Sequence, residues 1–335
     1  MDNKLLTISI AAYNVEKYLD FSLNSLLTDS EALKLLQILI VNDGSKDETL
    51  KIANNYARQY PDSIEVIDKI NGGYGSTINE SIRLAKGKYF KLLDGDDWYD
   101  SSNLYYYLKY LDKTNTDLVL TPYERIYEDG AKPQIMKRHN LEPEISYKMM
   151  ELQSNDLQDI HMHELTVKTE LLQRTDTHIT EHCFYTDNEF VFIPMLEAET
   201  ISLYDKVIYK YRIGNEGQSV SIEGRIKHYS DCERVIKKCM NLYLRKKNKL
   251  CPIAIEKAEK MIKDMSVFQY TNYFLCKSTN KIRNEVREFD RYLYNADKFI
   301  YNSLNCCLKE LRFMRATKFY ALGLIHVIRI LKRNI

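Results

Sequence analysis

Short apolar runs alternate with amphipathic segments through the first hundred residues, and this alternation is the feature that most constrains the fold. The apolar runs predict buried strands over 5–13, 36–43, 64–69 and 88–94. Helical spacing of the apolar residues between them predicts helices over 16–27, 46–60 and 75–87. This rhythm is typical of βαβ units around a mostly parallel sheet. We therefore expect an α/β, Rossmann-like sheet with flanking helices, which binds ligands beyond the carboxyl ends of its strands.

The rest of the sequence divides into a mixed region and a helical region. Residues 116–130 predict two strands and a turn, 131–140 an exposed loop, 166–174 a helix and 202–213 two short strands. From residue 226 onward the pattern is helical. We expect a domain over 1–225, with halves 1–100 and 101–225, followed by a helical domain over 226–335.

Charge is distributed unevenly between these regions. Of the 48 basic and 47 acidic residues, 23 and 10 fall within 231–335, which leaves 25 and 37 for 1–230. A basic segment behind an acidic body suggests an anionic partner such as lipid or nucleic acid, or the acidic body itself.

The cysteines and the apolar runs of the sequence predict where in the cell the protein is found. Its seven cysteines are odd in number and contain no CxxC pair, so we expect reduced thiols. Met1–Lys4 lead directly into the first apolar run, and no apolar run reaches the roughly 18 residues of a membrane span. We therefore expect no signal peptide and a cytoplasmic location.

A polar loop follows each of the four predicted strands. The loops contain "AYN" (12–14), "NDGS" (42–45), "NGG" (71–73) and "DGDD" (94–97). Because the carboxyl ends of parallel strands meet at one edge of a sheet, these four loops are expected to line a single cleft. Neither glycine-containing loop is a GxGxxG or Walker A motif, which disfavours a dinucleotide or P-loop site.

Three acids, Asp94, Asp96 and Asp97, stand within four positions, where like charges repel. Carboxylates bind Mg²⁺ or Mn²⁺, often together with substrate phosphates, and such a cation would offset the repulsion. Alternatively, the acids form a solvated turn and cap the following helix. The acids alone do not decide between these two interpretations.

The motifs taken together carry a family resemblance. In order, "ISIAAYNVEKYLDFSLNSLL", "ILIVNDGSKDETLKIA", "INGGYGSTINESIRLAKGKYFKLLDGDDW" and "YTDNEF" resemble a family 2 glycosyltransferase of the GT-A type. The resemblance is dense over 5–100 and thinner over 160–222. One departure lies at or beside Ala11, where the family usually has proline. The resemblance implies an inverting, metal-dependent hexosyltransferase that uses a nucleotide-sugar.

The resemblance also implies roles for residues that bind the donor. Tyr13 would lie against the nucleobase, and Asp43 would hydrogen-bond it. Gly72 and Gly73 would lie near the donor, and Asp94 would contact the ribose or the metal-bound diphosphate.

The same resemblance implies a metal site and a catalytic base. Asp96 would bind Mn²⁺ or Mg²⁺ together with Asp94. The family's base is the Asp of an "ED" pair, here Asp187 with Thr186 in place of Glu, and Glu189 is the second candidate. It would deprotonate the acceptor hydroxyl. Without the resemblance, Asp187 is equally explained as a helix N-cap.

Two further groups of residues invite a functional interpretation. His161, His163, His178 and His182 have spacings that suit zinc on a strand and on a helix, but a structural or acceptor-site role is favoured because no further ligand stands out. The loop in 209–221 is either a connector or a lid whose Arg212, Gln218 and Ser219 meet donor phosphates or the acceptor.

The last segment, 315–335, predicts an amphipathic helix. Its basic residues recur at steps of three or four positions: Arg315, Lys318, His326, Arg329 and Arg333. Such a helix can lie on an anionic membrane surface, as a peripheral protein does, or can pack on its own domain or on a second subunit.

We therefore expect transfer of a sugar, most simply from a UDP-sugar, to a glycan or lipid-linked acceptor in cell-surface polysaccharide synthesis, without a nucleic-acid partner and with a homo-oligomer left open. One alternative is a nucleotidyltransferase, although its usual glycine- and Lys/Arg-rich loop is missing after the first strand. Another is a degenerate family member that acts as a non-catalytic binding subunit.

Overall fold

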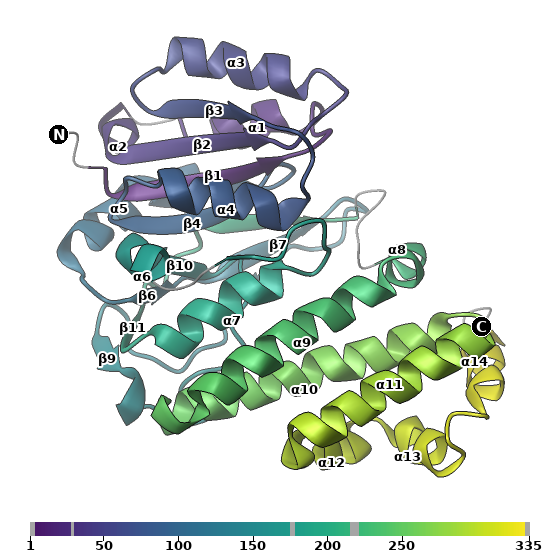
Figure 1. Cartoon of the computed structure of the whole chain (residues 1–335). Coiled ribbons are helices and arrows are strands. Elements are labelled where there is room, and N and C mark those ends of the chain that lie inside the picture. The colour runs from purple at the N-terminus through teal and green to yellow at the C-terminus, as the bar shows by residue number, and fades with distance from the viewer. Residues whose placement is uncertain (1–3, 28–29, 175–177, 215–220, 332–335) are drawn as a thin grey trace. The chain divides into compact units, whose positions relative to one another are not determined.

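The computed structural model describes residues 4–27, 30–174, 178–214 and 221–331 (Figure 1). The chain divides into two compact units, Met1–Asn215 and Glu216–Ile335. The strands of the first unit are β1 Leu6–Ala12, β2 Leu36–Asn42, β3 Ile64–Asp68, β4 Tyr89–Asp94, β5 Trp98–Tyr99, β6 Leu118–Leu120, β7 Tyr123–Tyr127, β8 Gln134–Met136, β9 Ser146–Lys148, β10 Leu165–Lys168, β11 Thr200–Leu203 and β12 Tyr209–Ile213. Its α-helices are α1 Leu19–Asn24, α2 Ser30–Leu35, α3 Thr49–Gln59, α4 Tyr74–Leu84, α5 Ser101–Lys113, α6 Thr169–Arg174 and α7 Asp187–Glu197.

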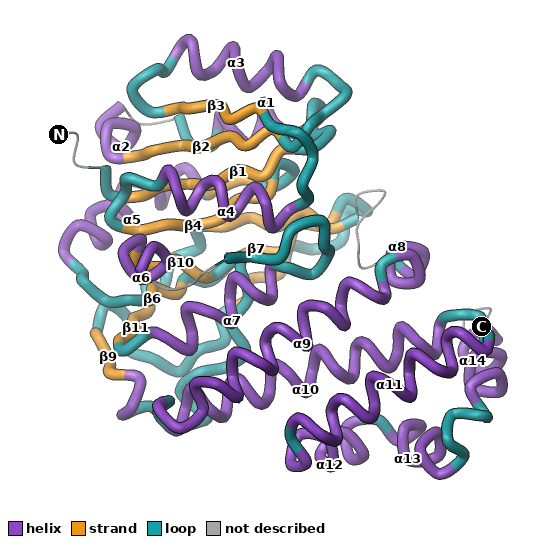
Figure 2. The backbone as a smooth tube through the Cα atoms, in the orientation of Figure 1, coloured by secondary structure: helices purple, strands orange, loops and turns teal. Residues whose placement is uncertain are grey.

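The main sheet confirms the predicted α/β alternation. Within the described residues its order is β3-β2-β1-β4-β10-β6-β11-β9, and β1 to β4 are parallel (Figure 2). Every residue of β2 is buried, because α2, α3 and α4 all pack against this strand. Such complete burial suits the apolar run over 38–41 within this strand.

The strand register brings the four predicted loops to one edge. Ala11 of β1 pairs with Asp94 of β4, and Ala12 pairs with Asn42 of β2. Asn42 in turn pairs with Asp68 of β3. These strand ends therefore form one row, as the polar punctuation of the sequence predicts.

A second, smaller sheet has the order β5-β12-β7-β8. In it Tyr99 pairs with Tyr209, and Lys210 pairs with Trp98. Because β5 follows the acidic loop directly, this pairing fixes the far end of that loop to β12.

Several predicted elements were wrong in type or extent. The predicted helix 166–174 begins only at Thr169, since 165–168 form β10, which pairs antiparallel with β4 and β6. Residues 134–136, predicted as loop, form β8 against β7. Short segments of this kind are decided by strand partners distant in sequence. The helices predicted over 16–27 and 75–87 are shorter, and α2 was not predicted.

The second unit is helical, as predicted. Its α-helices are α8 Ile222–Lys227, α9 Tyr229–Lys246, α10 Pro252–Leu275, α11 Asn280–Ala296, α12 Lys298–Cys307, α13 Lys309–Ala316 and α14 Leu322–Leu331. The long α10 contacts α9, α11, α12 and α14. None of the helices in the described ranges is long and apolar enough to cross a membrane.

The predicted continuous helix over 315–335 was also wrong. Lys318 and Phe319 both have positive φ, which ends α13 and redirects the chain before α14. Arg315 does not join an exposed basic face: its Nε lies 2.8 Å from Asp290 Oδ1, and only 12% of its side chain is exposed. Arg329 lies in α14, but its side chain is outside the described part of the structure, and Arg333 lies outside the described residues.

We expect Phe190→Ala to lower the free energy of unfolding of the first unit by about 3–5 kcal/mol. Phe190 is fully buried and its ring centroid lies 5.9 Å from that of Phe90, so the substitution leaves a cavity between α7 and β4. Urea denaturation would measure the change. Phe190→Leu should lose much less, and an equal loss in both variants would contradict a packing role.

Candidate active site

The first two loops at the sheet edge are joined by hydrogen bonds. The backbone N–H of Asn14 donates to Ser45 Oγ (3.0 Å), and Asn14 Oδ1 accepts from the backbone N–H of Lys46 (2.9 Å). Asn14 has a φ of 54°, a conformation that asparagine tolerates better than most residues. The preceding Tyr13, the predicted nucleobase contact, is 50% exposed at the end of β1. The Tyr13 ring is therefore accessible to a ligand.

Asp43, predicted to hydrogen-bond the nucleobase, is buried against the glycine loop. Its Oδ1 accepts the backbone N–H of Gly72 and its Oδ2 that of Gly73, both at 2.8 Å. Lys69 Nζ lies 2.8 Å from the same carboxylate. Gly73 has a φ of 80°, which a side chain would strain. In this structure Asp43 thus fixes the loop beside the predicted donor site.

The acidic loop is held by two tyrosines. Tyr74 Oη donates to Asp94 Oδ1 (2.7 Å). The backbone N–H of Asp94 donates to Tyr209 Oη (3.1 Å), which itself donates to Asp97 Oδ2 (2.6 Å). The other oxygen of Asp97 accepts the backbone N–H of Arg212 (2.7 Å). Two tyrosines and one backbone amide therefore stabilise the packed carboxylates.

Burial and mutual repulsion raise the pKa values of the Asp94 and Asp97 carboxyl groups. Burial, reinforced by the charge of Asp96, raises the pKa of Asp94 to about 7. Burial and the neighbouring charge of Asp94 also raise the pKa of Asp97 well above its usual value. Carboxyl groups in this state gain much from a nearby cation.

His163 joins the acids although it is distant from them in sequence. One ligand atom each of Asp94, Asp97 and His163 lies within 4.8 Å of the others, so the three could hold a metal ion. The His163 ring packs against Tyr211, with centroids 4.3 Å apart, and burial lowers its pKa to about 3. Its Nδ1 is buried without a hydrogen-bond partner among the described residues. A neutral imidazole with a buried lone pair suits metal ligation.

The predicted metal ligand Asp96 is not in this group. Its backbone carbonyl accepts Arg212 Nε (2.9 Å), and the Arg212 guanidinium lies 4.8 Å from the Trp98 ring and 5.0 Å from the Tyr18 ring. Arg212, predicted to meet donor phosphates, thus holds the turn that carries the acids. Gln218 and Ser219, predicted to act with it, lie outside the described residues.

Asp187, the predicted base, is the first residue of α7, and Thr186 occupies the N-cap without a side-chain capping bond. Burial raises the pKa of Asp187. The negative charge of Asp187 helps to raise the pKa values of Asp94 and Tyr74, so the structure brings base and acidic loop together. Asp187 is thus a neighbour of the acidic loop.

The segment before α7 packs on the glycine loop. The backbone N–H of His182 donates to the Gly72 carbonyl (2.6 Å), and a Cβ on Gly75 would meet the Thr180 carbonyl at 2.2 Å. Asn79 of α4 binds both backbone polar groups of Ile179, at 2.7 and 2.8 Å. The candidate base therefore stands on a segment fixed to the predicted donor loop.

The second base candidate and two histidines have different positions from those predicted. Glu189 is fully buried and its Oε2 accepts the backbone N–H of Thr180 (2.8 Å), so it anchors this segment. His178 and His182 lie in a loop, so they do not have the helical spacing on which the disfavoured zinc interpretation depended. His161 bonds Tyr123 Oη through Nδ1 (2.8 Å), which is a structural contact.

Sequence reasoning missed Tyr74 and Tyr209 as members of the site, and it named His163 without placing it beside the acids. Tyr74 directly follows the two glycines, so its place at the sheet edge was available as a signal. Tyr209 and His163 reach the acids only through strand pairing and the fold of a loop, which their own sequence does not reveal.

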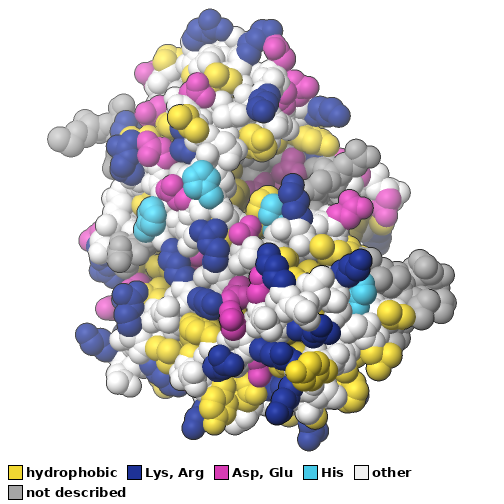
Figure 3. Space-filling model, turned by 45° about the vertical axis from the view of Figure 1, so that its right-hand side comes forward, with side chains coloured by type: hydrophobic (Ala, Val, Ile, Leu, Met, Phe, Trp, Pro, Cys, Tyr) yellow, Lys and Arg dark blue, Asp and Glu magenta, His cyan; other side chains and the backbone are white. Residues whose placement is uncertain are grey.

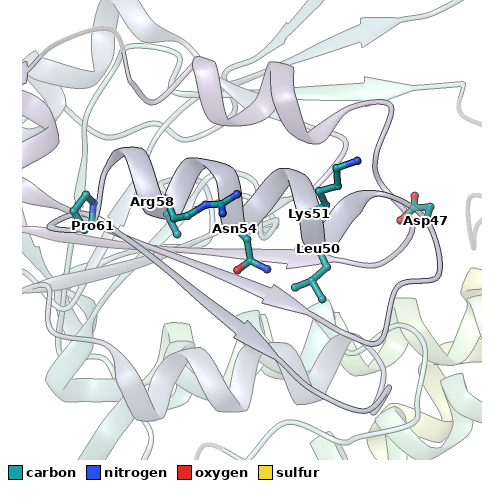
Figure 4. A pocket seen from close by; sticks show the side chains of 7 residues that line it. Asp47, Leu50, Lys51, Asn54, Arg58 and Pro61 are labelled. Carbon is teal, nitrogen blue, oxygen red and sulfur yellow. The ribbon is translucent and has the colours of Figure 1, made fainter.

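The groove that runs along α3 is separate from these residues. It has a volume of about 790 Å³ and is lined by Asp47, Leu50, Lys51, Asn54, Ala57, Arg58 and Pro61. These side chains extend along the helix in Figure 4, and none of them is a predicted site residue. The groove therefore adds nothing to the candidate active site.

Comparison with known proteins defines the class. Residues 7–176 match the sequence profile of Glycosyl transferase family 2. The match spans just over half of the 335 residues, and the chain belongs to this family.

Two curated relatives are similar over much of the first unit. EpsJ of Bacillus subtilis, an uncharacterized glycosyltransferase, is 28% identical over 222 residues, which cover 62% of this chain and 61% of EpsJ. The poly(ribitol-phosphate) beta-glucosyltransferase of Bacillus spizizenii is 25% identical over 218 residues, which cover 65% of this chain and 33% of that protein. The chain thus spans less than two thirds of either relative.

Two solved structures share the fold. TarS 1–349 of S. aureus in complex with UDP-GlcNAc has a TM-score of 0.69 at 18% identity, over 98% of this chain and 92% of that chain. The mannosyltransferase PcManGT of Pyrobaculum calidifontis, in complex with GDP-Man and Mn²⁺, has a TM-score of 0.53 at 13% identity, over 98% and 87% of the two chains. The predicted GT-A fold with a C-terminal helical region is confirmed.

Asp43→Ala should free the glycine loop without unfolding the sheet. The variant leaves the buried amide of Gly72 and the partly buried amide of Gly73 without their acceptor and removes the partner of Lys69, at a cost of about 2–4 kcal/mol. Hydrogen exchange should accelerate at both glycine amides. The matched variant Asp62→Ala, an exposed acid in the turn before β3, should leave this exchange unchanged. Unchanged protection in Asp43→Ala would show that the loop is fixed by other contacts.

Proposed function

We propose that this family 2 glycosyltransferase is an inverting enzyme that transfers a sugar from a UDP-sugar to an acceptor hydroxyl. The observation that carries the proposal is the meeting of Asp94, Asp97 and His163 with Asp187 at the carboxyl edge of the sheet. In this proposal the donor binds and is activated beside Asp187, which can act as the base. The UDP complexes of TarS support the choice of donor.

Asp187 acts as the base in this proposal. Its carboxylate accepts the proton of the acceptor hydroxyl as that oxygen attacks the anomeric carbon, and the bond to the nucleoside diphosphate breaks on the opposite face. Burial raises the pKa of Asp187, which makes the carboxylate a stronger base than an exposed aspartate. Tyr13 contacts the nucleobase, and the amides near Gly72 and Gly73 border the diphosphate.

A divalent cation fits the donor set in the first unit. Two carboxylates and a neutral imidazole can hold it, and the imidazole favours Mn²⁺ over Mg²⁺, which prefers oxygen ligands. When bound, the cation would neutralise the departing diphosphate. We assign Asp94, Asp97 and His163 to this site, in place of the predicted pair Asp94 and Asp96.

The acceptor is proposed to be a surface glycan or its lipid-linked precursor. The relative from Bacillus spizizenii is named for transfer to poly(ribitol-phosphate), a polymer of the cell surface. Family membership argues against the nucleotidyltransferase alternative. The assembled acids and base argue against a non-catalytic binding subunit.

Loss of the metal ligands should abolish transfer. UDP release from a panel of UDP-sugars is expected with Mn²⁺ and not with EDTA. Asp97→Asn and His163→Ala should each lower kcat/KM by more than about a hundredfold and weaken Mn²⁺ binding. Asp100→Asn is the matched control, because Asp100 caps α5 and asparagine caps as well. If Asp97→Asn and His163→Ala were both fully active in the presence of EDTA, this metal site would be excluded.

Loss of the base should affect chemistry and spare donor binding. Asp187→Asn is expected to lower kcat by about 10²–10⁴-fold with little change in the affinity for UDP. Because burial raises the pKa of Asp187, activity of the native enzyme should fall on acidification with a midpoint above the ordinary value of 3.8. Glu197→Gln, at the other end of α7, should retain activity. Normal turnover by Asp187→Asn would require another base.

A further inference from the structure

The second unit exposes apolar side chains on one face of α14. Tyr320, Leu324 and Val327 are 68%, 56% and 52% exposed, whereas Leu322 and Ile325 are buried. Leu324 and Val327 are spaced as neighbours on one face of α14, and Tyr320 is exposed in the turn that directly precedes the helix. We call these three residues the α14 ridge. Large apolar side chains in a continuous row are unusual on the surface of a monomer.

The turn before α14 creates the ridge. Lys318 and Phe319 have positive φ, at 48° and 60°, and the Phe319 amide donates to the Met314 carbonyl (2.7 Å). This turn buries Phe319 and leaves the next residue, Tyr320, facing outward. The exposure of the ridge is therefore built into the backbone of the second unit.

Basic residues surround the ridge. The Arg287 guanidinium lies 4.5 Å from the Tyr320 ring, and its Nε donates to the Lys318 carbonyl (2.7 Å). On another side, Gly323 lies beside Ser278, whose chain neighbour Lys277 is exposed. Basic and hydrophobic side chains are interspersed in the lower part of Figure 3. The sequence has no Asp or Glu from residue 311 to its end.

We propose that the α14 ridge and its basic neighbours bind the surface of an anionic lipid bilayer. Apolar side chains would enter the boundary between head groups and acyl chains while the exposed Lys277 and Lys318 meet lipid phosphates. Tyrosine suits this boundary because its ring is apolar and its hydroxyl polar. The excess of basic residues, 23 against 10 in 231–335, favours an anionic partner over an uncharged protein surface or a second copy of this basic unit.

The inference goes beyond the proposed function and is tested without donor or acceptor, so its failure would leave the transfer reaction untouched. The full chain is incubated with phosphatidylcholine vesicles, with or without about one third phosphatidylglycerol, and bound protein is measured by flotation. Binding is expected only to the anionic vesicles and should weaken with salt. Equal binding to both vesicle types, or none to either, would overturn the proposal.

Amino-acid substitutions separate the electrostatic contribution to vesicle binding from the apolar one. Lys277→Gln and Lys318→Gln should each lower the binding constant about fivefold, and Tyr320→Ser/Leu324→Ser/Val327→Ser more than about tenfold. The matched control Lys132→Gln/Ile135→Ser alters exposed residues of the first unit and should bind as the native chain does. Circular dichroism would verify folding. If the triple variant bound vesicles as well as the native chain, the assignment to lipid would be overturned. The same holds if light scattering showed that the native chain is a dimer and that only the triple variant is a monomer.

Discussion

The hydrogen bonds of Tyr209 are the interaction on which the candidate site depends. Its hydroxyl accepts the amide of Asp94 and donates to the carboxylate of Asp97, so one group fixes both ends of the acidic turn. Tyr209 is itself set by β12, which pairs with β5 and β7. The smaller sheet thereby decides where the acids point. The carboxylates of Asp94 and Asp97 are tolerated because their hydrogen-bond partners are fixed in α4 and β12.

The donor side and the base side of the site are also mechanically connected. The backbone of the segment before α7 touches the glycine loop at Gly72 and Gly75 with no room for an added Cβ at Gly75. Asp43 fixes the same loop from the other side through the amides of Gly72 and Gly73. A displacement of this loop would therefore move Asp187 as well as the proposed nucleotide contacts. Accurate positioning of two reactants is a large part of enzymatic rate enhancement.

The sequence predicted the parts of the fold that depend on local pattern. The first four strands carry short, mainly apolar runs, so their existence and their common edge could be inferred, and that edge places Asp43 and Asp94 in one region. Asp187 was assigned only through the family resemblance. By contrast, β10 is a four-residue strand whose identity depends on pairing with β4 and β6. For the same reason His163, two residues before β10, could not be placed beside the acids. The position of Arg212 depends on an aromatic enclosure formed by residues from two distant segments.

The charge of the first unit bears on how it can bind an anionic donor. A nucleoside diphosphate would approach Asp94, Asp96 and Asp97, and unit charges about 4 Å apart repel by about 4 kcal/mol at the effective dielectric near a protein surface. Neither tyrosine can offset this repulsion, because burial and the neighbouring acids raise their pKa values and keep both hydroxyls neutral. Lys91, the buried lysine of β4, has its pKa lowered to about 7 by burial and donates to the carbonyls of His163 and Leu165. Binding of a diphosphate at this edge therefore requires positive charge from outside the acidic turn, which is the physical reason to place a divalent cation in the proposed reaction.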